Sequence, residues 1–123
     1  METEIIQNLF VGDLADARHG FDGIVINLLG DIPDGEPASA IWMPFLANGR
    51  ATLDSSAAII DRALELGARV MVHCEEGCER APLVVAWFLK TRRGFSLDDA
   101  YRLLKERRPI IEDRRRWLGI LNR

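Results

Sequence analysis

Short apolar runs alternate along this chain with longer segments in which apolar residues recur at helical spacing. Residues 23–29 and 70–72 are rich in β-branched residues and almost continuously apolar, a pattern typical of strands buried on both faces of a parallel sheet. Shorter extended pieces, bounded by turn-forming residues, lie before and between them. The predicted strands are residues 5–6, 9–11, 23–29, 40–43 and 70–72.

Helices are expected between and after these strands. Residues 83–91 are apolar almost all round, which places that helix in the centre of the domain. Thr52 or Asp54 could cap the preceding helix, and Gly67 could end it. Ser96 resembles the start of a capping box. The predicted helices are a short turn at residues 13–17 and the segments 54–66, 83–91, 97–108 and 117–121.

Strands that alternate with helices predict an α/β fold: a single domain, residues 1–123, with a mainly parallel central sheet flanked by helices. With 48% hydrophobic and 28% charged residues, the composition is that of a soluble globular protein. No apolar run approaches the roughly 18 residues that span a bilayer, and the start, residues 1–4, is acidic, unlike a secretory signal. We therefore expect a cytoplasmic protein with no membrane partner.

The net charge of −3 is unevenly distributed along the chain. Residues 1–79 hold 14 acidic and 4 basic side chains, whereas residues 80–123 hold 5 acidic and 12 basic ones. The asymmetry fits either a dipolar solvated surface or a basic face that attracts an anionic substrate. A nucleic-acid partner is not expected, because the basic residues carry little aromatic interleaving and no recognised motif.

The segment His73 to Arg80 links a predicted buried strand to a predicted buried helix, where open α/β sheets bind ligands. Backbone N–H groups of a tight loop can wrap an anion, and the amino end of the helix adds further N–H groups. Arg80 would supply a planar, two-pronged donor to phosphate oxygens. Cys74 would lie beneath the phosphate, where the same positive field favours its nucleophilic thiolate form.

His73-Cys74, five residues and then Arg80 resemble the signature of the cysteine-dependent protein tyrosine phosphatases. The resemblance is to their dual-specificity branch and covers nearly the whole chain in the family's order. It implies that phosphomonoesters are hydrolysed through a phosphocysteine intermediate on Cys74, with Arg80 stabilising the transition state and an aspartate protonating the leaving oxygen. The segments that carry it are residues 6–13, 23–28, 73–80, 81–87 and 96–109.

The resemblance also implies the partners and the substrate-binding residues. We expect a phosphorylated protein (phosphotyrosine, and also phosphoserine or phosphothreonine) or a small phosphomonoester as substrate. No metal or other cofactor is expected. His73 is expected to hold the shape of the loop. The implied substrate-binding residues are His73, Glu75, Glu76, Gly77, Cys78, Glu79 and Arg80.

Two positions depart from the family pattern in ways that bear on turnover. Ala81 stands where family members usually carry Ser or Thr, whose hydroxyl helps the thiolate leave, so the second step is expected to be slow. The segment 44–50 contains no acid where the family places its general acid. Asp54 is the nearest candidate for that role, and its alternative role is a helix cap or first-turn acid. Loss of a general acid costs roughly 10²–10⁴ in rate.

The loop also holds three glutamates and a second cysteine. Glu75, Glu76 and Glu79 weaken the attraction of the loop for anions, which argues against highly phosphorylated inositides and favours a phosphotyrosine-like or small monophosphate substrate. Cys78 could be a small packing residue or a disulfide partner that protects Cys74 from over-oxidation. Such a disulfide would be strained unless the loop remodels.

Other chemistries remain open for the same loop. A degenerate phosphatase fold could bind phosphorylated partners without turnover, although a pure binder has no need of the Cys74 thiolate. A sulfurtransferase of the rhodanese type also uses a cysteine loop, usually with fewer residues before its basic end than the five found here. His73, Cys74 and Cys78 offer three zinc ligands, but a fourth is not evident.

Overall fold

The computed structural model of the chain describes residues 1–29, 40–44 and 49–121. The predicted loop at residues 30–37 lies outside the described residues. So do residues 45–48, which form most of the segment where the family places its general acid.

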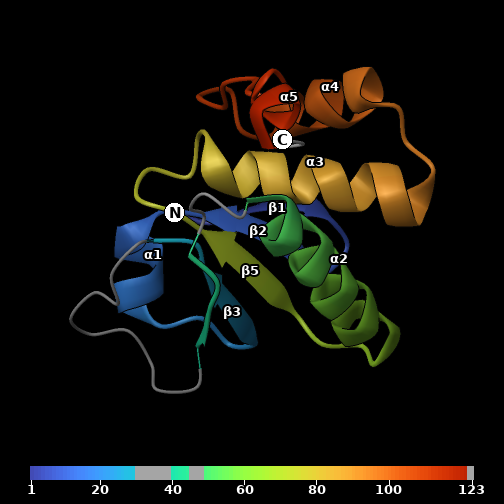
Figure 1. Cartoon of the computed structure of the whole chain (residues 1–123). Helices are drawn as coiled ribbons and strands as arrows, with labels where there is room; N and C mark the ends of the chain where they lie inside the picture. The colour runs from blue at the N-terminus through green and yellow to red at the C-terminus, as the bar shows by residue number, and fades with distance from the viewer. Residues whose placement is uncertain (30–39, 45–48, 122–123) are drawn as a thin grey trace.

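The centre of the fold is a five-stranded sheet with the strand order β1-β2-β5-β3-β4 (Figure 1). β1 and β2 pair antiparallel, and the other neighbouring strands pair parallel. This confirms the predicted α/β fold with a mainly parallel sheet. The strands are β1 Thr3–Ile6, β2 Leu9–Gly12, β3 Ile24–Asn27, β4 Ile41–Trp42 and β5 Val70–His73.

Helices cover both faces of this sheet (Figure 1). One face carries α2 and α3, which pack against each other, and α4 lies over α3. On the other face α1 packs through Ala17 against Val25 and Met71. The helices are α1 Leu14–His19, α2 Gly49–Glu65, α3 Arg80–Arg93, α4 Leu97–Arg107 and α5 Trp117–Leu121. None of them is long and apolar enough to cross a membrane.

The two central elements, β5 and α3, meet in the core. Val70 and Val72 of β5 face the main core, while Met71 between them faces the smaller cluster at α1, as the two-residue period of a strand requires. All nine residues from Ala81 to Leu89 are buried, so the prediction of a central helix is confirmed. The turn between β5 and α3 is therefore held at both ends by buried structure.

Several element boundaries differ from the sequence-based ones. α2 begins at Gly49, so the prediction that Thr52 or Asp54 caps it is wrong: both lie inside the helix. The strand expected at residues 23–29 ends at Asn27. The side-chain oxygen of Asn27 accepts the Leu29 N–H at 2.8 Å, and this bond turns the chain. At α4, Ser96 does act as the N-cap and accepts the N–H of Asp99.

Candidate active site

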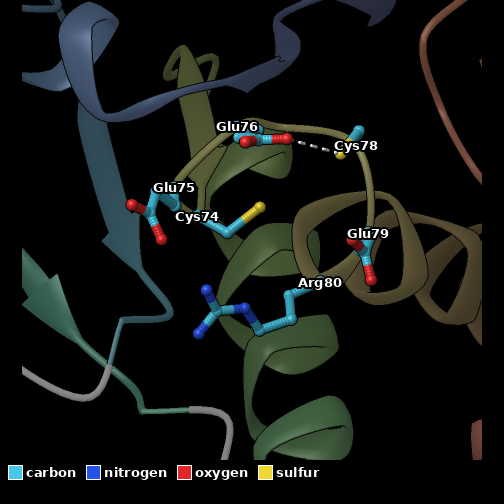
Figure 2. Close-up of a pocket in the computed structure, with 6 residues that line it drawn as sticks. All are labelled: Cys74, Glu75, Glu76, Cys78, Glu79 and Arg80. Atoms are coloured by element: carbon cyan, nitrogen blue, oxygen red, sulfur yellow. Dashed lines mark hydrogen bonds between the residues drawn. The ribbon is translucent and has the colours of Figure 1, made fainter.

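The loop between β5 and α3 surrounds a small cavity of about 200 Å³ (Figure 2). Six of the nine sequence-predicted site residues, residues 74–79, lie between these two elements, while His73 ends β5 and Arg80 begins α3. Six of the nine line the cavity, whereas His73, Gly77 and Asp54 do not. The lining residues are Cys74, Glu75, Glu76, Cys78, Glu79 and Arg80.

Cys74 lies at the start of the loop, directly after the last residue of β5. Its side chain is 3% exposed, and its Sγ points into the space enclosed by the loop (Figure 2). The backbone N–H of Ala81, in the first turn of α3, donates to Sγ at 3.4 Å. A backbone donor and the positive end of a helix both stabilise negative charge on sulfur. The position suits a nucleophile.

Residues outside the loop donate hydrogen bonds to its backbone carbonyls. The Leu14 N–H at the start of α1 donates to the Glu75 carbonyl at 2.9 Å, and the Glu112 N–H donates to the Cys78 carbonyl at 2.8 Å. None of the N–H groups of residues 75–80 donates to an acceptor among the residues that the structure describes. The bonded carbonyls fix the loop, and the N–H groups remain available to a bound anion.

Arg108, the C-cap residue of α4, donates to two of the loop carbonyls and is only 7% exposed. Its Nε donates to the Gly77 carbonyl at 3.0 Å, and its Nη2 donates to the Glu76 carbonyl at 3.3 Å. Its Nη1 also donates to Thr3 Oγ1 at 2.9 Å, which ties β1 to the loop. Sequence reasoning missed this residue, since an arginine at a helix end before a proline is ordinarily a solvated charge.

Gly77 is required where the loop turns. Its φ is +69°, in the left-handed region that side chains disfavour. A Cβ at this position would lie 2.7 Å from the Gly12 carbonyl oxygen and 2.8 Å from Arg108 Nη2. Backbone conformation and space therefore both demand glycine, even though the residue does not line the cavity.

Arg80 begins α3 and extends beneath Cys74 toward the open side of the loop (Figure 2). Within the described part of the chain, its guanidinium makes no hydrogen bond or ion pair, so its donors are available to a ligand. The neighbouring Glu79 does have a partner: its carboxylate accepts from Arg114 Nε at 3.1 Å. Arg114 thus pairs with one of the three loop glutamates, and its Nη2 also pairs with Glu112.

The other two glutamates, Glu75 and Glu76, are exposed at the rim of the cavity. The Cys78 thiol donates to Glu76 Oε2 over 3.7 Å. Burial first, and then this hydrogen bond, raise the pKa of Cys78 to about 11. Cys78 is therefore protonated at neutral pH. Both Cys74 and Cys78 are free thiols in this structure.

His73 is fully buried at the end of β5, level with Gly12 and Asn27 of the two neighbouring strands. Its Nδ1 lies 3.4 Å from the Cys74 carbonyl oxygen. The ring therefore lies against the backbone at the nucleophile, and its role in shaping the loop stays a prediction. Among the residues that the structure describes, no group of three His, Cys, Asp or Glu side chains is placed to hold a metal ion.

Asp54 lies on α2, outside the cavity lining. Its Oδ1 accepts the indole N–H of Trp87 at 2.8 Å, and its Oδ2 lies 3.5 Å from Arg50 Nε. The same Arg50 guanidinium stacks over the Trp87 ring at 4.4 Å from its centroid. These contacts join α2 to α3. The alternative role of a helix cap or first-turn acid is wrong, because the first turn of α2 holds no acid.

The sequence model described as "Dual specificity phosphatase, catalytic domain" matches residues 38–123, which include the whole loop. The chain belongs to the dual-specificity phosphatase family. Protein 123R of Invertebrate iridescent virus 6, which carries a provisional tyrosine phosphatase name, is 30% identical over 117 residues, which cover 89% of this chain and 81% of the viral one. The resemblance inferred from the sequence is thereby confirmed, and the findings support a cysteine-dependent protein phosphatase.

Other relatives of this dual-specificity phosphatase match over shorter stretches or through the fold. Human dual specificity protein phosphatase 8 is 44% identical over 70 residues, 56% of this chain but only 11% of that protein. The crystal structure of human DUSP28 superposes with a TM-score of 0.76 at 23% identity, covering 98% of this chain and 90% of that one. The structure of the human tyrosine phosphatase-like serine/threonine/tyrosine-interacting protein superposes with a TM-score of 0.73 at 22% identity. The superposition covers 98% of this chain and 93% of that one. These structures share the fold.

Proposed function

We propose that this protein hydrolyses phosphomonoesters through a phosphocysteine intermediate on Cys74. The observation that carries the proposal is the arrangement around its sulfur. Sγ accepts the Ala81 N–H, and the N–H groups of residues 75–80 donate to nothing else among the described residues. A phosphoryl group held by those donors would lie over a sulfur in line for attack.

In the first step the Cys74 thiolate bonds to phosphorus, and the bond from phosphorus to the leaving oxygen breaks. The leaving oxygen takes up a proton from solvent water. Arg80 and the loop N–H groups stabilise the charge that develops on the equatorial oxygens. In the second step a water oxygen attacks phosphorus and gives up its proton to solvent, the sulfur–phosphorus bond breaks, and inorganic phosphate and the thiolate are released.

Two residues limit the proposed rate. Ala81 has no hydroxyl to donate to the departing sulfur, so the phosphocysteine is expected to break down slowly. Asp54, the candidate general acid, does not line the cavity, and its carboxylate contacts Trp87 and Arg50 instead. We therefore expect the best turnover with leaving groups that need no protonation.

The proposed substrates are phosphorylated proteins, with phosphotyrosine or phosphoserine and phosphothreonine, or small phosphomonoesters. The proposed location is the cytoplasm. The family supports phosphoprotein and phosphomonoester substrates in general. The small cavity of about 200 Å³ suits a single phosphoryl group with little more of the substrate enclosed.

A second function is binding of phosphorylated partners without turnover. Ala81 and the absence of Asp54 from the cavity lining favour it, since both would slow catalysis and leave binding intact. The buried Cys74 with a donor on its sulfur favours catalysis instead. The two functions differ in a single quantity, the rate of phosphate release.

The test is steady-state hydrolysis of para-nitrophenyl phosphate by the reduced protein beside Cys74→Ser. We expect slow turnover that depends on Cys74, with a loss of at least about 10⁴-fold in the variant. Circular dichroism and thermal unfolding verify that both proteins are folded. Folded wild-type protein that releases no more product than Cys74→Ser would overturn catalysis and leave phosphate binding as the function.

A further inference from the structure

The cavity carries an unusual charge for a site that receives a phosphoryl group. Three of its six lining side chains are glutamates, Glu75, Glu76 and Glu79, against one guanidinium, Arg80. Like charges lower the affinity of an anionic ligand. The free N–H groups of residues 75–80 offset part of this effect for the phosphoryl group itself. They do not offset the repulsion that the glutamates exert on negatively charged groups elsewhere in the substrate.

The three carboxylates are not equivalent. Glu79 pairs with Arg114 at 3.1 Å. No cation among the described residues pairs with Glu75 or Glu76, and both are exposed at the rim. The excess negative charge of the cavity is therefore concentrated on these two side chains.

Burial separates the floor of the cavity, at the buried Cys74, from its exposed rim, at Glu75 and Glu76. Figure 2 shows Glu75 on one side of Arg80 and Glu79 on the other, with Glu76 next to Cys78. A phosphoryl group over Cys74 would meet Arg80 and the loop N–H groups first. The groups attached to that phosphoryl would extend past the rim, where they meet Glu75 and Glu76.

We infer that the site selects phosphorylated polypeptides in which lysine or arginine flanks the phosphorylated residue. This inference rests on the proposed function and narrows its substrate class. Basic flanking residues pair with Glu75 and Glu76 and offset the excess charge, whereas acidic flanking residues add to the repulsion. Complementary charges of this kind fix which partner is accepted and raise the rate of encounter.

The test compares phosphotyrosine peptides that differ only in having lysine or glutamate on both sides of the phosphotyrosine. Their Kd values are measured on Cys74→Ser, which cannot turn them over, and their kcat/KM values on the wild-type protein. At low ionic strength we expect the basic peptide to bind roughly tenfold more tightly, from two exposed charge pairs. The preference should shrink in high salt as screening shortens the range of the field.

Variants assign the preference to the rim. Glu75→Gln with Glu76→Gln should reduce it to about twofold or less. Glu75→Gln alone should reduce it partly, and its side chain makes no hydrogen bond with the described residues whose loss could unfold the protein. Glu65→Gln is the control, because Glu65 is an exposed acid at the end of α2, on the opposite end of β5 from the loop, and its ion pair is with Arg62 of the same helix.

Equal binding of the two peptides, tighter binding of the acidic one, or a preference that survives the double substitution would each overturn the inference. Hydrolysis of para-nitrophenyl phosphate, which has no flanking charge, is measured alongside. Absence of that turnover sinks the proposed catalysis only, because peptide preference is read from Kd on Cys74→Ser. Normal turnover with no peptide preference sinks the inference only.

Discussion

The two sides of the loop between β5 and α3 differ in how their polar groups are used. On the outer side the carbonyls of residues 75–78 accept from Leu14, Arg108 and Glu112. On the cavity side the N–H groups of residues 75–80 donate to nothing among the described residues. A buried or constrained backbone normally satisfies both kinds of group. The outer side is therefore structural, and the cavity side is prepared for a ligand.

This difference predicts that substitutions on the two sides separate stability from function. Arg80 on the cavity side has no partner within the described residues, so its loss should leave folding intact. Gly77 and Arg108 on the outer side are packed and bonded, so their loss should cost stability and function together.

Arg80→Met is expected to have the largest effect on turnover. Losing the guanidinium that stabilises the transferring phosphoryl group should lower kcat/KM for para-nitrophenyl phosphate by roughly 10³-fold. Thermal unfolding should hardly change. A variant with near-normal turnover, or one that fails to fold, would contradict the assignment of Arg80 to the cavity side.

Gly77→Ala tests the outer side, with Gly94→Ala as its control. Both glycines have positive φ values, 69° and 73°, but a Cβ at Gly94 meets nothing within 4 Å. We expect Gly94→Ala to cost about 1 kcal/mol from the backbone conformation alone, with normal turnover. Gly77→Ala should cost at least about 2–3 kcal/mol because it also collides with the Gly12 carbonyl, and it should lose phosphate binding.

Chemical denaturation measures the two costs, and para-nitrophenyl phosphate hydrolysis measures the function. Equal destabilisation by the two substitutions would mean that the contact between the loop and Gly12 does not constrain the loop.

Asp54→Asn is expected to have a smaller effect. The asparagine side-chain oxygen can still accept the Trp87 N–H, so stability should fall by less than about 1 kcal/mol. Turnover of phenyl phosphate, whose leaving group needs a proton, should fall by less than about tenfold. A loss of about 10²-fold or more with phenyl phosphate, but not with para-nitrophenyl phosphate, would instead make Asp54 the general acid.

The smallest expected effect concerns Cys78. Because burial and the bond to Glu76 raise its pKa to about 11, only about 10⁻⁴ of this thiol is ionised at neutral pH. Iodoacetamide should alkylate Cys74 and leave Cys78 unmodified, and Cys78 should become reactive only as the pH rises toward that value. Peptide mapping by mass spectrometry reads both sites. Equal alkylation at neutral pH would contradict the buried, hydrogen-bonded thiol.

The sequence predicted the sheet, the central helix and the loop because each is local. The apolar run at residues 70–72 and the apolar residues of α3 fix both ends of the loop, and Cys74 and Arg80 lie within it. The sequence could not predict the hydrogen bonds to the outer side of the loop, because these come from segments distant in the chain. Arg108 reaches the loop across 31 residues of sequence, and nothing in its local pattern distinguishes it from its neighbour Arg107.

Asp54 shows the same limit from the other side. Its place in the sequence suggested either a general acid or a cap, because the start of α2 could not be located from its pattern. The helix begins five residues earlier, at Gly49, and Asp54 contacts Trp87 of α3 instead. Contacts between helices depend on tertiary packing, which local pattern and propensity do not encode.

The most direct test of the central claim is to trap the phosphoryl-enzyme. Protein mixed with para-nitrophenyl phosphate is quenched in acid during steady-state turnover, and its mass and the modified residue are measured beside Ala81→Ser. We expect nearly every molecule to carry one phosphoryl group on Cys74, because Ala81 offers no donor to the leaving sulfur. In Ala81→Ser the trapped fraction should fall and kcat should rise roughly tenfold. Sustained phosphate release with no phosphoryl group on Cys74 would contradict the phosphocysteine mechanism.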